Sequence, residues 1–219
     1  MIDCIVVLSG GMDSTVLLAD ALKRNRHPAA ISFDYGSKHN DRELPRAAEI
    51  CKKFGVSHRI IRLPFIGELF SSSLLSSGEA IPDGNYNEAD MKRTVVPFRN
   101  GILLSIAVGY AESKGAAEVL LGSHAGDHFI YPDCRPEFNK AFAEAALLGT
   151  DRAVHVLFPF ASITKRDIGD LGRTLDVDFA ATWTCYRGGE IHCGTCAACL
   201  ERKNALRNDE GLDPTPYAA

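Results

Sequence analysis

The N-terminal segment constrains the fold more than any other part of the chain. Residues 4–8 are a run of apolar, mostly β-branched side chains, which is typical of a fully buried strand. Two glycines follow directly, and a helical pattern then extends over about residues 13–26. A buried strand that passes through a glycine turn into a helix is typical of a parallel α/β sheet.

The alternation of strand and helix patterns continues along most of the chain. We expect strands at residues 4–8, 29–33, 58–63, 119–122 and 154–158, and helices at residues 13–26, 41–54, 101–113, 136–148 and 165–175, with Asn100 and Thr164 as helix caps. This order predicts an α/β fold with a doubly wound parallel sheet and helices on both faces. Because ligands bind beyond the carboxyl ends of such strands, the loops after residues 8, 33 and 121 should share one crevice.

Residues 66–93 interrupt this alternation. They are rich in Ser, Gly and Asn and show no clear period. We expect an excursion that acts as a partly mobile lid.

Composition narrows the classes of function. The 219 residues carry a formal charge of −4, which argues against a broad nucleic-acid surface. No segment approaches the roughly 20 apolar residues of a membrane helix, and the N-terminus lacks the basic flank of a signal peptide. We therefore expect a cytoplasmic protein without a membrane partner, whose seven cysteines stay reduced.

The glycine turn has the composition of a phosphate-binding loop. In Ser9-Gly10-Gly11-Met12-Asp13-Ser14, the glycines let backbone N–H groups point inward around an anion, and the helix start adds its positive dipole end. Both serines supply hydroxyls, and Asp13 can hold Mg²⁺ beside the phosphates. The string is neither a Walker loop nor a Rossmann fingerprint. A plain capped turn is the alternative, but the strand–loop–helix context favours phosphate binding.

Four cysteines near the C-terminus have metal-ligand spacing. Cys185, Cys193, Cys196 and Cys199 lie within fifteen residues and can close a tetrahedral shell around one ion. A closed shell indicates a structural site, and we expect one Zn²⁺ per chain. An iron–sulfur cluster is the alternative, because C-x₂-C-x₂-C also binds such clusters.

The phosphate loop resembles the PP-loop of the ATP pyrophosphatase superfamily, which implies an adenine nucleotide alpha hydrolase-like fold. Members of that superfamily split ATP between its α and β phosphates and adenylate a substrate oxygen. Four further strings lie at residues 96–100, 127–138, 164–165 and 184–199. With the loop, they resemble the 7-cyano-7-deazaguanine synthase family of queuosine-precursor biosynthesis over residues 2–207. Two departures are Phe98, where many members have Gly, and Thr184, where Ser is usual.

The resemblance implies an ATP-dependent carbon–nitrogen ligase. Its substrates would be ATP with Mg²⁺, ammonia and 7-carboxy-7-deazaguanine, and its product the 7-cyano compound, formed through an adenylated carboxylate and an adenylated amide. The implied ATP-binding residues are Leu8, Ser9, Gly10, Gly11, Met12, Asp13, Ser14, Thr15, Asp34 and Tyr35.

The implied catalytic and substrate residues are Arg99, Asn100, Asp127, Tyr131, Asp133 and Lys165. The two cationic side chains would neutralise phosphate or carboxylate charge. Either Asp127 or Asp133 would accept hydrogen bonds from the guanine-like edge of the substrate.

Two other functions remain open. A PP-loop enzyme that thiolates tRNA would need an RNA-binding surface, and a nucleotide-binding zinc module would carry out no chemistry. We expect no direct nucleic-acid partner and a homodimer. We also expect two parts, a nucleotide-binding α/β domain over residues 1–180 and a four-cysteine zinc knuckle with a helix over residues 181–219.

Overall fold

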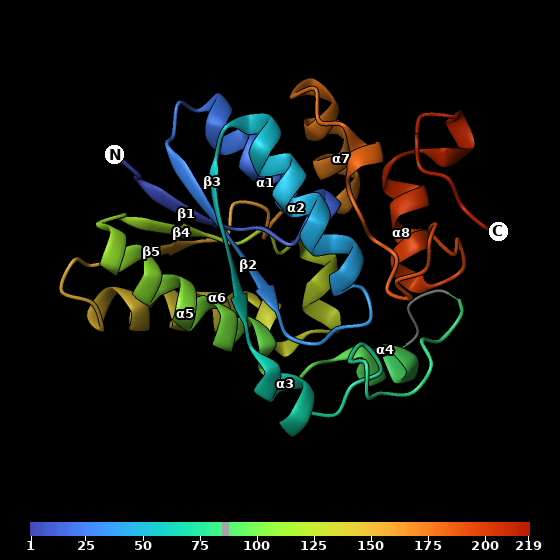
Figure 1. Cartoon of the computed structure of the whole chain (residues 1–219), viewed down its shortest axis with the longest axis horizontal. Helices are drawn as coiled ribbons and strands as arrows, with labels where there is room; N and C mark the ends of the chain where they lie inside the picture. The colour runs from blue at the N-terminus through green and yellow to red at the C-terminus, as the bar shows by residue number, and fades with distance from the viewer. Residues whose placement is uncertain (85–87) are drawn as a thin grey trace.

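The computed structural model describes residues 1–84 and 88–219 (Figure 1). Its centre is a five-stranded sheet in the order β3-β2-β1-β4-β5, with every neighbouring pair parallel. The strands are β1 (Cys4–Val7), β2 (Pro28–Asp34), β3 (Ser57–Arg62), β4 (Glu118–Leu120) and β5 (His155–Leu157). This confirms the predicted doubly wound sheet. The strand order reverses beside β1, which places the expected crevice between β1 and β4.

Helices cover both faces of the sheet. Helices α1 (Met12–Lys23), α2 (Asn40–Phe54) and α7 (Lys165–Thr174) lie on one face, and α5 (Arg99–Lys114) and α6 (Pro136–Leu148) on the other (Figure 1). The remaining helical segments are α3 (Pro64–Leu69), α4 (Glu88–Thr94), α8 (Ala197–Ala205) and four 3₁₀ turns, η1 (Ala125–Phe129), η2 (Pro132–Cys134), η3 (Phe179–Ala181) and η4 (Asn208–Glu210).

The buried strand β1 supplies side chains to both layers. Ile5 and Val7 belong to the hydrophobic core under α5. Cys4, Val6 and Leu8 belong to the core under α1 and α7. Side chains alternate across a strand, so a continuous apolar run is what burial on both faces requires.

Two helix starts follow the sequence closely. Pro136 occupies the first turn of α6, where its missing N–H costs nothing. Thr164 caps α7 in a capping box, accepting from the Asp167 N–H while the Asp167 carboxylate accepts from the Thr164 N–H.

The predicted cap at Asn100 is wrong. Helix α5 already begins at Arg99, and the Asp133 carboxylate accepts from the Asn100 N–H at 2.7 Å. The Asn100 amide instead donates to Cys134 Sγ. The residue before the helix, Phe98, has φ of 52°, a left-handed conformation that glycine adopts at lower cost.

The excursion contains more structure than its composition indicates. Its two ends fold as α3 and α4. Ser37 pairs with Leu75 in an isolated bridge, and Lys38 Nζ donates to the carbonyls of Ser73 and Gly78 at 2.8 and 2.9 Å. These bonds attach the described part of the excursion to the loop after β2. Residues 85–87 of the expected lid lie outside the described residues, and its mobility stays a prediction.

The C-terminal part is tied to the α/β domain by a buried arginine. Arg202 is fully buried and donates to Thr182 and Thr215 hydroxyls, both at 2.8 Å, and to the Phe179 carbonyl at 2.6 Å. Cys185 belongs to the same core cluster as β1 and β2. Residues on both sides of the predicted boundary at residue 180 therefore share one core.

One stretch, Met91–Lys114, which joins the end of α4 to α5, is long and apolar enough by length and composition alone to cross a membrane. Half of its most apolar window is buried inside the protein, and α5 within it packs against the sheet. A core helix of a soluble protein has the same length and composition.

Candidate active site

A cavity of about 220 Å³ opens beyond the carboxyl ends of β1, β2 and β4. This is the crevice that the strand order predicts. Of the expected site residues, it brings together Leu8, Ser9, Gly11, Met12, Asp13, Ser14, Tyr35, Arg99, Asn100, Asp127, Tyr131 and Lys165.

The phosphate loop is held in shape by its own hydroxyls. Ser9 Oγ accepts from the Gly11 N–H at 3.0 Å and lies 3.1 Å from Ser14 Oγ. Thr15 Oγ1 donates to the Gly11 carbonyl at 2.7 Å, so Thr15 supports the loop without lining the cavity. Gly10 is buried with φ of 93°, and its carbonyl accepts from the Trp183 N–H at 2.9 Å.

A lysine and several acids face one another beside the loop. Lys165, the first residue of α7, lies with Nζ 3.1 Å from Asp13 Oδ2 and 2.9 Å from Glu201 Oε2. His124 Nε2 lies 3.6 Å from Asp127 Oδ1 and 3.8 Å from Glu201 Oε1. Burial raises the pKa of Asp127, while His124 and Lys165 oppose the rise. Such a group of oxygens beside a phosphate loop suits Mg²⁺ bound to phosphates.

The opposite wall carries an arginine and aromatic rings. The Arg99 guanidinium lies 5.9 Å from the centre of the Tyr35 ring. Burial alone would lower the pKa of Arg99, but Tyr35 and Asp133 raise it, so the side chain stays charged. The Tyr131 and Tyr186 hydroxyls lie 3.4 Å apart. This wall therefore combines a fixed positive charge with flat surfaces.

Two expected site carboxylates do not line the cavity. Asp34 Oδ1 accepts from the Asn40 amide at 2.8 Å. Asp133 is buried and accepts from the backbone of Asn100, at the start of α5. Of the two acids considered for the substrate edge, Asp127 is the one that faces the cavity.

Among the residues that line the cavity, His39, Glu43, Trp183 and Glu201 were not predicted from the sequence. The sequence gives one signal for His39 and Glu43, which is their spacing of four residues across the start of a predicted helix. Trp183 and Glu201 flank the cysteine cluster, but no pattern connects them to a loop more than 150 residues earlier.

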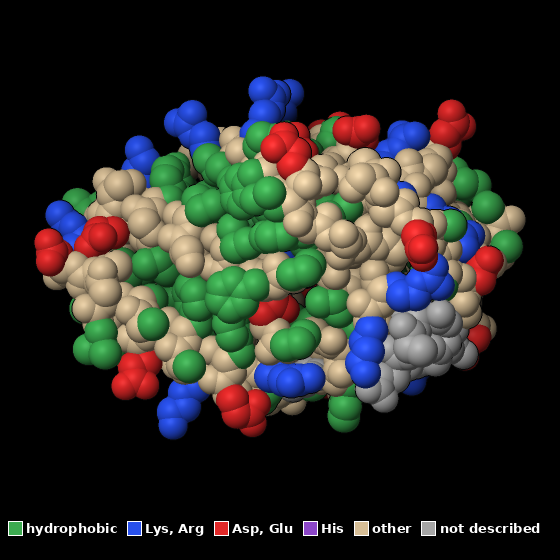
Figure 2. Space-filling view, turned by 90° about the horizontal axis from the view of Figure 1, so that it is seen from below, with side chains coloured by type: hydrophobic (Ala, Val, Ile, Leu, Met, Phe, Trp, Pro, Cys, Tyr) green, Lys and Arg blue, Asp and Glu red, His purple; other side chains and the backbone are tan. Residues whose placement is uncertain are grey.

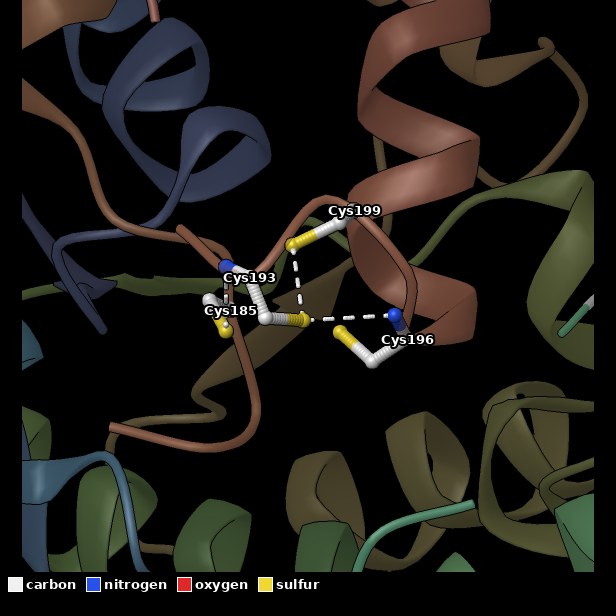
Figure 3. Close-up of side chains that lie close together, drawn as sticks. All are labelled: Cys185, Cys193, Cys196 and Cys199. Atoms are coloured by element: carbon white, nitrogen blue, oxygen red, sulfur yellow. Dashed lines mark hydrogen bonds between the residues drawn. The ribbon is translucent and has the colours of Figure 1, made fainter. Parts of the chain in front are cut away.

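The four cysteines converge as their spacing predicts. Their sulfur atoms all lie within 4.8 Å of one another, with Cys193 and Cys199 3.9 Å apart (Figure 3). Tetrahedral zinc with bonds of 2.3 Å would separate its sulfur ligands by about 3.8 Å. The N–H groups of Cys193 and Cys196 point at neighbouring sulfurs, at 3.4 and 3.3 Å, which favours thiolates. The cluster can therefore hold one metal ion.

Comparisons with known proteins agree with this geometry. A family model described as queuosine biosynthesis protein QueC matches residues 3–210. The 7-cyano-7-deazaguanine synthase of Desulfotalea psychrophila is 71% identical over 217 residues, which are 99% of each chain. The synthase of Porphyromonas gingivalis (strain ATCC 33277) is 51% identical over 98% of this chain and 97% of its own.

A solved structure of similar fold is the NMN synthetase from Francisella tularensis, with a TM-score of 0.53 and 15% identity over 86% of this chain and 68% of that one. At this identity the likeness concerns the fold alone. The sequence relatives carry the assignment: this chain belongs to the QueC family of queuosine biosynthesis proteins, whose similar members are named 7-cyano-7-deazaguanine synthases.

Proposed function

We propose that this enzyme is an ATP-dependent ligase that converts 7-carboxy-7-deazaguanine and ammonia into 7-cyano-7-deazaguanine. The supporting observation is one cavity that joins a PP-loop, Lys165 and Arg99. Phosphate binding is thereby adjacent to a surface suited to a flat, anionic substrate. The names of the relatives at 71% and 51% identity give the product.

The chemistry explains the need for ATP. A carboxylate is a poor electrophile because its oxygen is a poor leaving group. Transfer of AMP makes that oxygen a good leaving group, and ammonia displaces it to give an amide. A second transfer of AMP, to the amide oxygen, makes that oxygen a leaving group too, and loss of AMP with both N–H protons gives the nitrile. One cavity can serve both halves because each begins with AMP transfer to an oxygen on the same carbon.

The residues beside the loop divide the work on the phosphates. The N–H groups of residues 9–14 would hold the phosphates that leave as pyrophosphate. Lys165, fixed between Asp13 and Glu201, would neutralise charge that develops as the α–β bond breaks. Asp13 offers an oxygen ligand for Mg²⁺, which would neutralise phosphate charge when bound.

The opposite wall suits the deazapurine. Arg99 carries a charge that can pair with the carboxylate before activation. Tyr131 and Tyr186 offer ring surface, and Asp127, on the loop side of the same cavity, offers an acceptor for the guanine-like edge. Asn100 lines the same wall and donates its amide to Cys134 Sγ, which would hold the start of α5 beside the substrate.

We infer that the cysteine site holds zinc in a structural role. All four sulfur atoms are close enough to bind one ion. In an iron–sulfur cluster the thiolates bind different iron atoms and therefore lie farther apart. Elemental analysis with an optical spectrum distinguishes the two. A brown protein with iron and acid-labile sulfide would overturn the zinc assignment.

The thiolating alternative loses support at Cys134. This thiol lines the cavity, but burial raises its pKa, so little reactive thiolate forms. A sulfur relay would need a second thiol there, and among the described residues the cavity is lined by no other cysteine.

The expected homodimer has a candidate surface. Apolar side chains gather on the face where α5 and α6 lie (Figure 2). Phe98, Phe138 and Phe142 form a row with ring centres 5.7 Å apart at each step, and 59% of Phe98 is exposed. A second copy covering this face would remove the apolar area from water. The mass in solution, by light scattering, tests the proposal.

The reaction itself is tested by incubating the zinc-loaded enzyme with Mg·ATP, ammonia and 7-carboxy-7-deazaguanine. We expect AMP and pyrophosphate to form much faster with all components than without the acid, and the amide to appear before the nitrile. Added amide should also become nitrile. If the enzyme does not act on the acid but modifies a tRNA transcript, the proposed reaction is wrong and the tRNA-thiolating function replaces it.

A further inference from the structure

The first turn of α2 lies directly against the phosphate loop, and Glu43 projects from it into the cavity. A Cβ added to Gly10 would lie 2.3 Å from the Glu43 carbonyl oxygen, and one added to Gly11 would lie 3.7 Å from Glu43 Oε1. Gly10 therefore lets the backbone of α2 approach the loop closely, and the Glu43 carboxyl group lies beside Gly11. The side chain is 16% exposed, and it lines the cavity with Arg99 and Trp183.

The groups around Glu43 leave its carboxyl weakly paired. On its own helix, His39 Nε2 lies 3.7 Å from Glu43 Oε2, beyond hydrogen-bond distance. The charge of Arg99, on α5, acts on the Glu43 carboxyl group. In the described part of the chain, however, the two side chains form no ion pair within 4 Å. The other cations of this turn are engaged elsewhere, Arg46 over the Trp183 ring at 4.6 Å and Arg42 on the Gly188 carbonyl at 3.4 Å.

The protonation states follow from this environment. Burial raises the pKa of Glu43 to about 8, with Arg99 opposing the rise. Burial and Arg99 lower the pKa of His39 to about 4, so the imidazole is neutral at pH 7. Glu43 can therefore exchange a proton near neutral pH while its neighbour does not. An acid with a raised pKa that lines a cavity beside a phosphate loop is a candidate for a role in the reaction.

Both halves of the proposed reaction release protons from nitrogen. In the first, ammonia forms a C–N bond, the C–O bond to AMP breaks with its electron pair on AMP, and the nitrogen loses one proton. In the second, the adenylated amide loses one N–H proton to give an imidate, and the electron pair of the last N–H bond then becomes the third C–N bond as AMP leaves with the C–O pair. A base beside the reacting carbon is needed each time, and Glu43 lines the same cavity as the phosphate loop and Arg99, between which the proposed function places that carbon.

We propose that Glu43 is this base: its carboxylate accepts the proton from the reacting nitrogen in both halves and returns it to solvent through the open cavity. This inference rests on the proposed function. Phosphate binding and AMP transfer need no such base, so the two can be separated.

The alternative is a purely structural glutamic acid. In that case Glu43→Gln, which keeps the shape and polarity of the protonated acid, would be almost silent. A general base contributes about 10²–10⁴-fold to rate. Glu43→Gln should therefore slow nitrile formation about 100-fold or more while slowing pyrophosphate release from the acid and ATP, without ammonia, by a far smaller factor.

The decisive experiment uses the 7-carboxamide as substrate, because its conversion to nitrile involves no titrating ammonia. With the zinc-loaded wild-type enzyme and Mg·ATP, kcat/KM for the amide should rise about tenfold per pH unit below pH 8 and level off above it. Glu43→Gln should be slow and lack this rise. Glu49→Gln, an exposed glutamate on the same helix, is the matched control and should behave as wild type.

Each other result has a definite meaning. Glu43→Gln with wild-type kcat/KM, with a retained rise, or with equal losses in both half-reactions would overturn the inference. If that variant does not fold, a wild-type profile without an ionisation near pH 8 overturns it instead. If the wild-type enzyme makes no nitrile from the amide at any pH, the proposed function itself fails, and this inference fails with it.

Discussion

Gly10 offers a test of how tightly the phosphate loop is packed against α2. Its φ of 93° is a conformation that an L side chain rarely adopts. A Cβ there would lie 2.3 Å from the Glu43 carbonyl oxygen and 2.9 Å from the Ala47 N, and both are backbone atoms of α2. Gly10→Ala must therefore move a helix or the loop, since no side chain can rotate out of the way.

The matched control is Gly55→Ala. Gly55 ends α2 with φ of 67°, and no described atom lies within 4 Å of the position of its Cβ. Left-handed backbone costs an alanine about 1 kcal/mol, so this variant should lose about that much stability. Gly10→Ala carries the same backbone cost and adds about 2–3 kcal/mol for forced overpacking.

Thermal unfolding with bound zinc measures the difference. For a chain of this size 1 kcal/mol shifts Tm by about 2–4 °C, so we expect Gly55→Ala to lose about 2–4 °C and Gly10→Ala roughly 6–15 °C. Gly10→Ala should also weaken ATP binding, and Gly55→Ala should leave it intact. Equal Tm losses in the two variants would refute the close contact between the loop and α2.

Four further predictions concern single groups. Asp13→Ala should lower Mg·ATP-dependent turnover tenfold or more, about 1.4 kcal/mol, and unchanged turnover would remove the loop from the mechanism. Cys199→Ser should lower zinc content and Tm together, which metal analysis and calorimetry check, and an unchanged Tm without zinc would contradict a structural site. Asp133→Ala should cost about 1 kcal/mol in urea unfolding, because it removes the acceptor at the start of α5, with little change in KM for the acid. Because the pKa of Glu43 is raised by folding, its stabilising contribution is complete below its unfolded pKa and is lost as pH rises towards 8. Glu43→Gln should therefore gain stability relative to wild type by up to about 1.4 kcal/mol per pH unit between pH 5 and 7, and parallel stability curves would contradict the raised pKa.

The sequence predicts those features that depend on local chemistry. The continuous apolar run of residues 4–8 predicts a strand that is buried on both faces, as β1 is. Thr164 predicts the start of α7, where it forms a capping box with Asp167. The cysteine spacing predicts four convergent thiols because each knuckle is short. These features need only neighbours within a few residues.

The parts that were missed depend on contacts between distant segments. Glu43 lies in a charged helical pattern and has the sequence character of a solvated residue until α2 packs on Gly10. Asp133 follows Tyr131-Pro132 like a loop carboxylate, and its role at α5 depends on η2 lying against that helix. Glu201 meets Lys165 across 36 positions.

The position of the cysteine site relative to the cavity connects structure to chemistry. Two residues before Cys185, the Trp183 N–H donates to Gly10 of the phosphate loop. Two residues after Cys199, Glu201 holds Lys165 opposite Asp13. A metal that fixes both ends of this knuckle thereby fixes the loop and its lysine from one side, although it touches neither. The zinc we propose is structural in its coordination, yet its loss should disturb phosphate binding through these two short connections before the sheet itself unfolds.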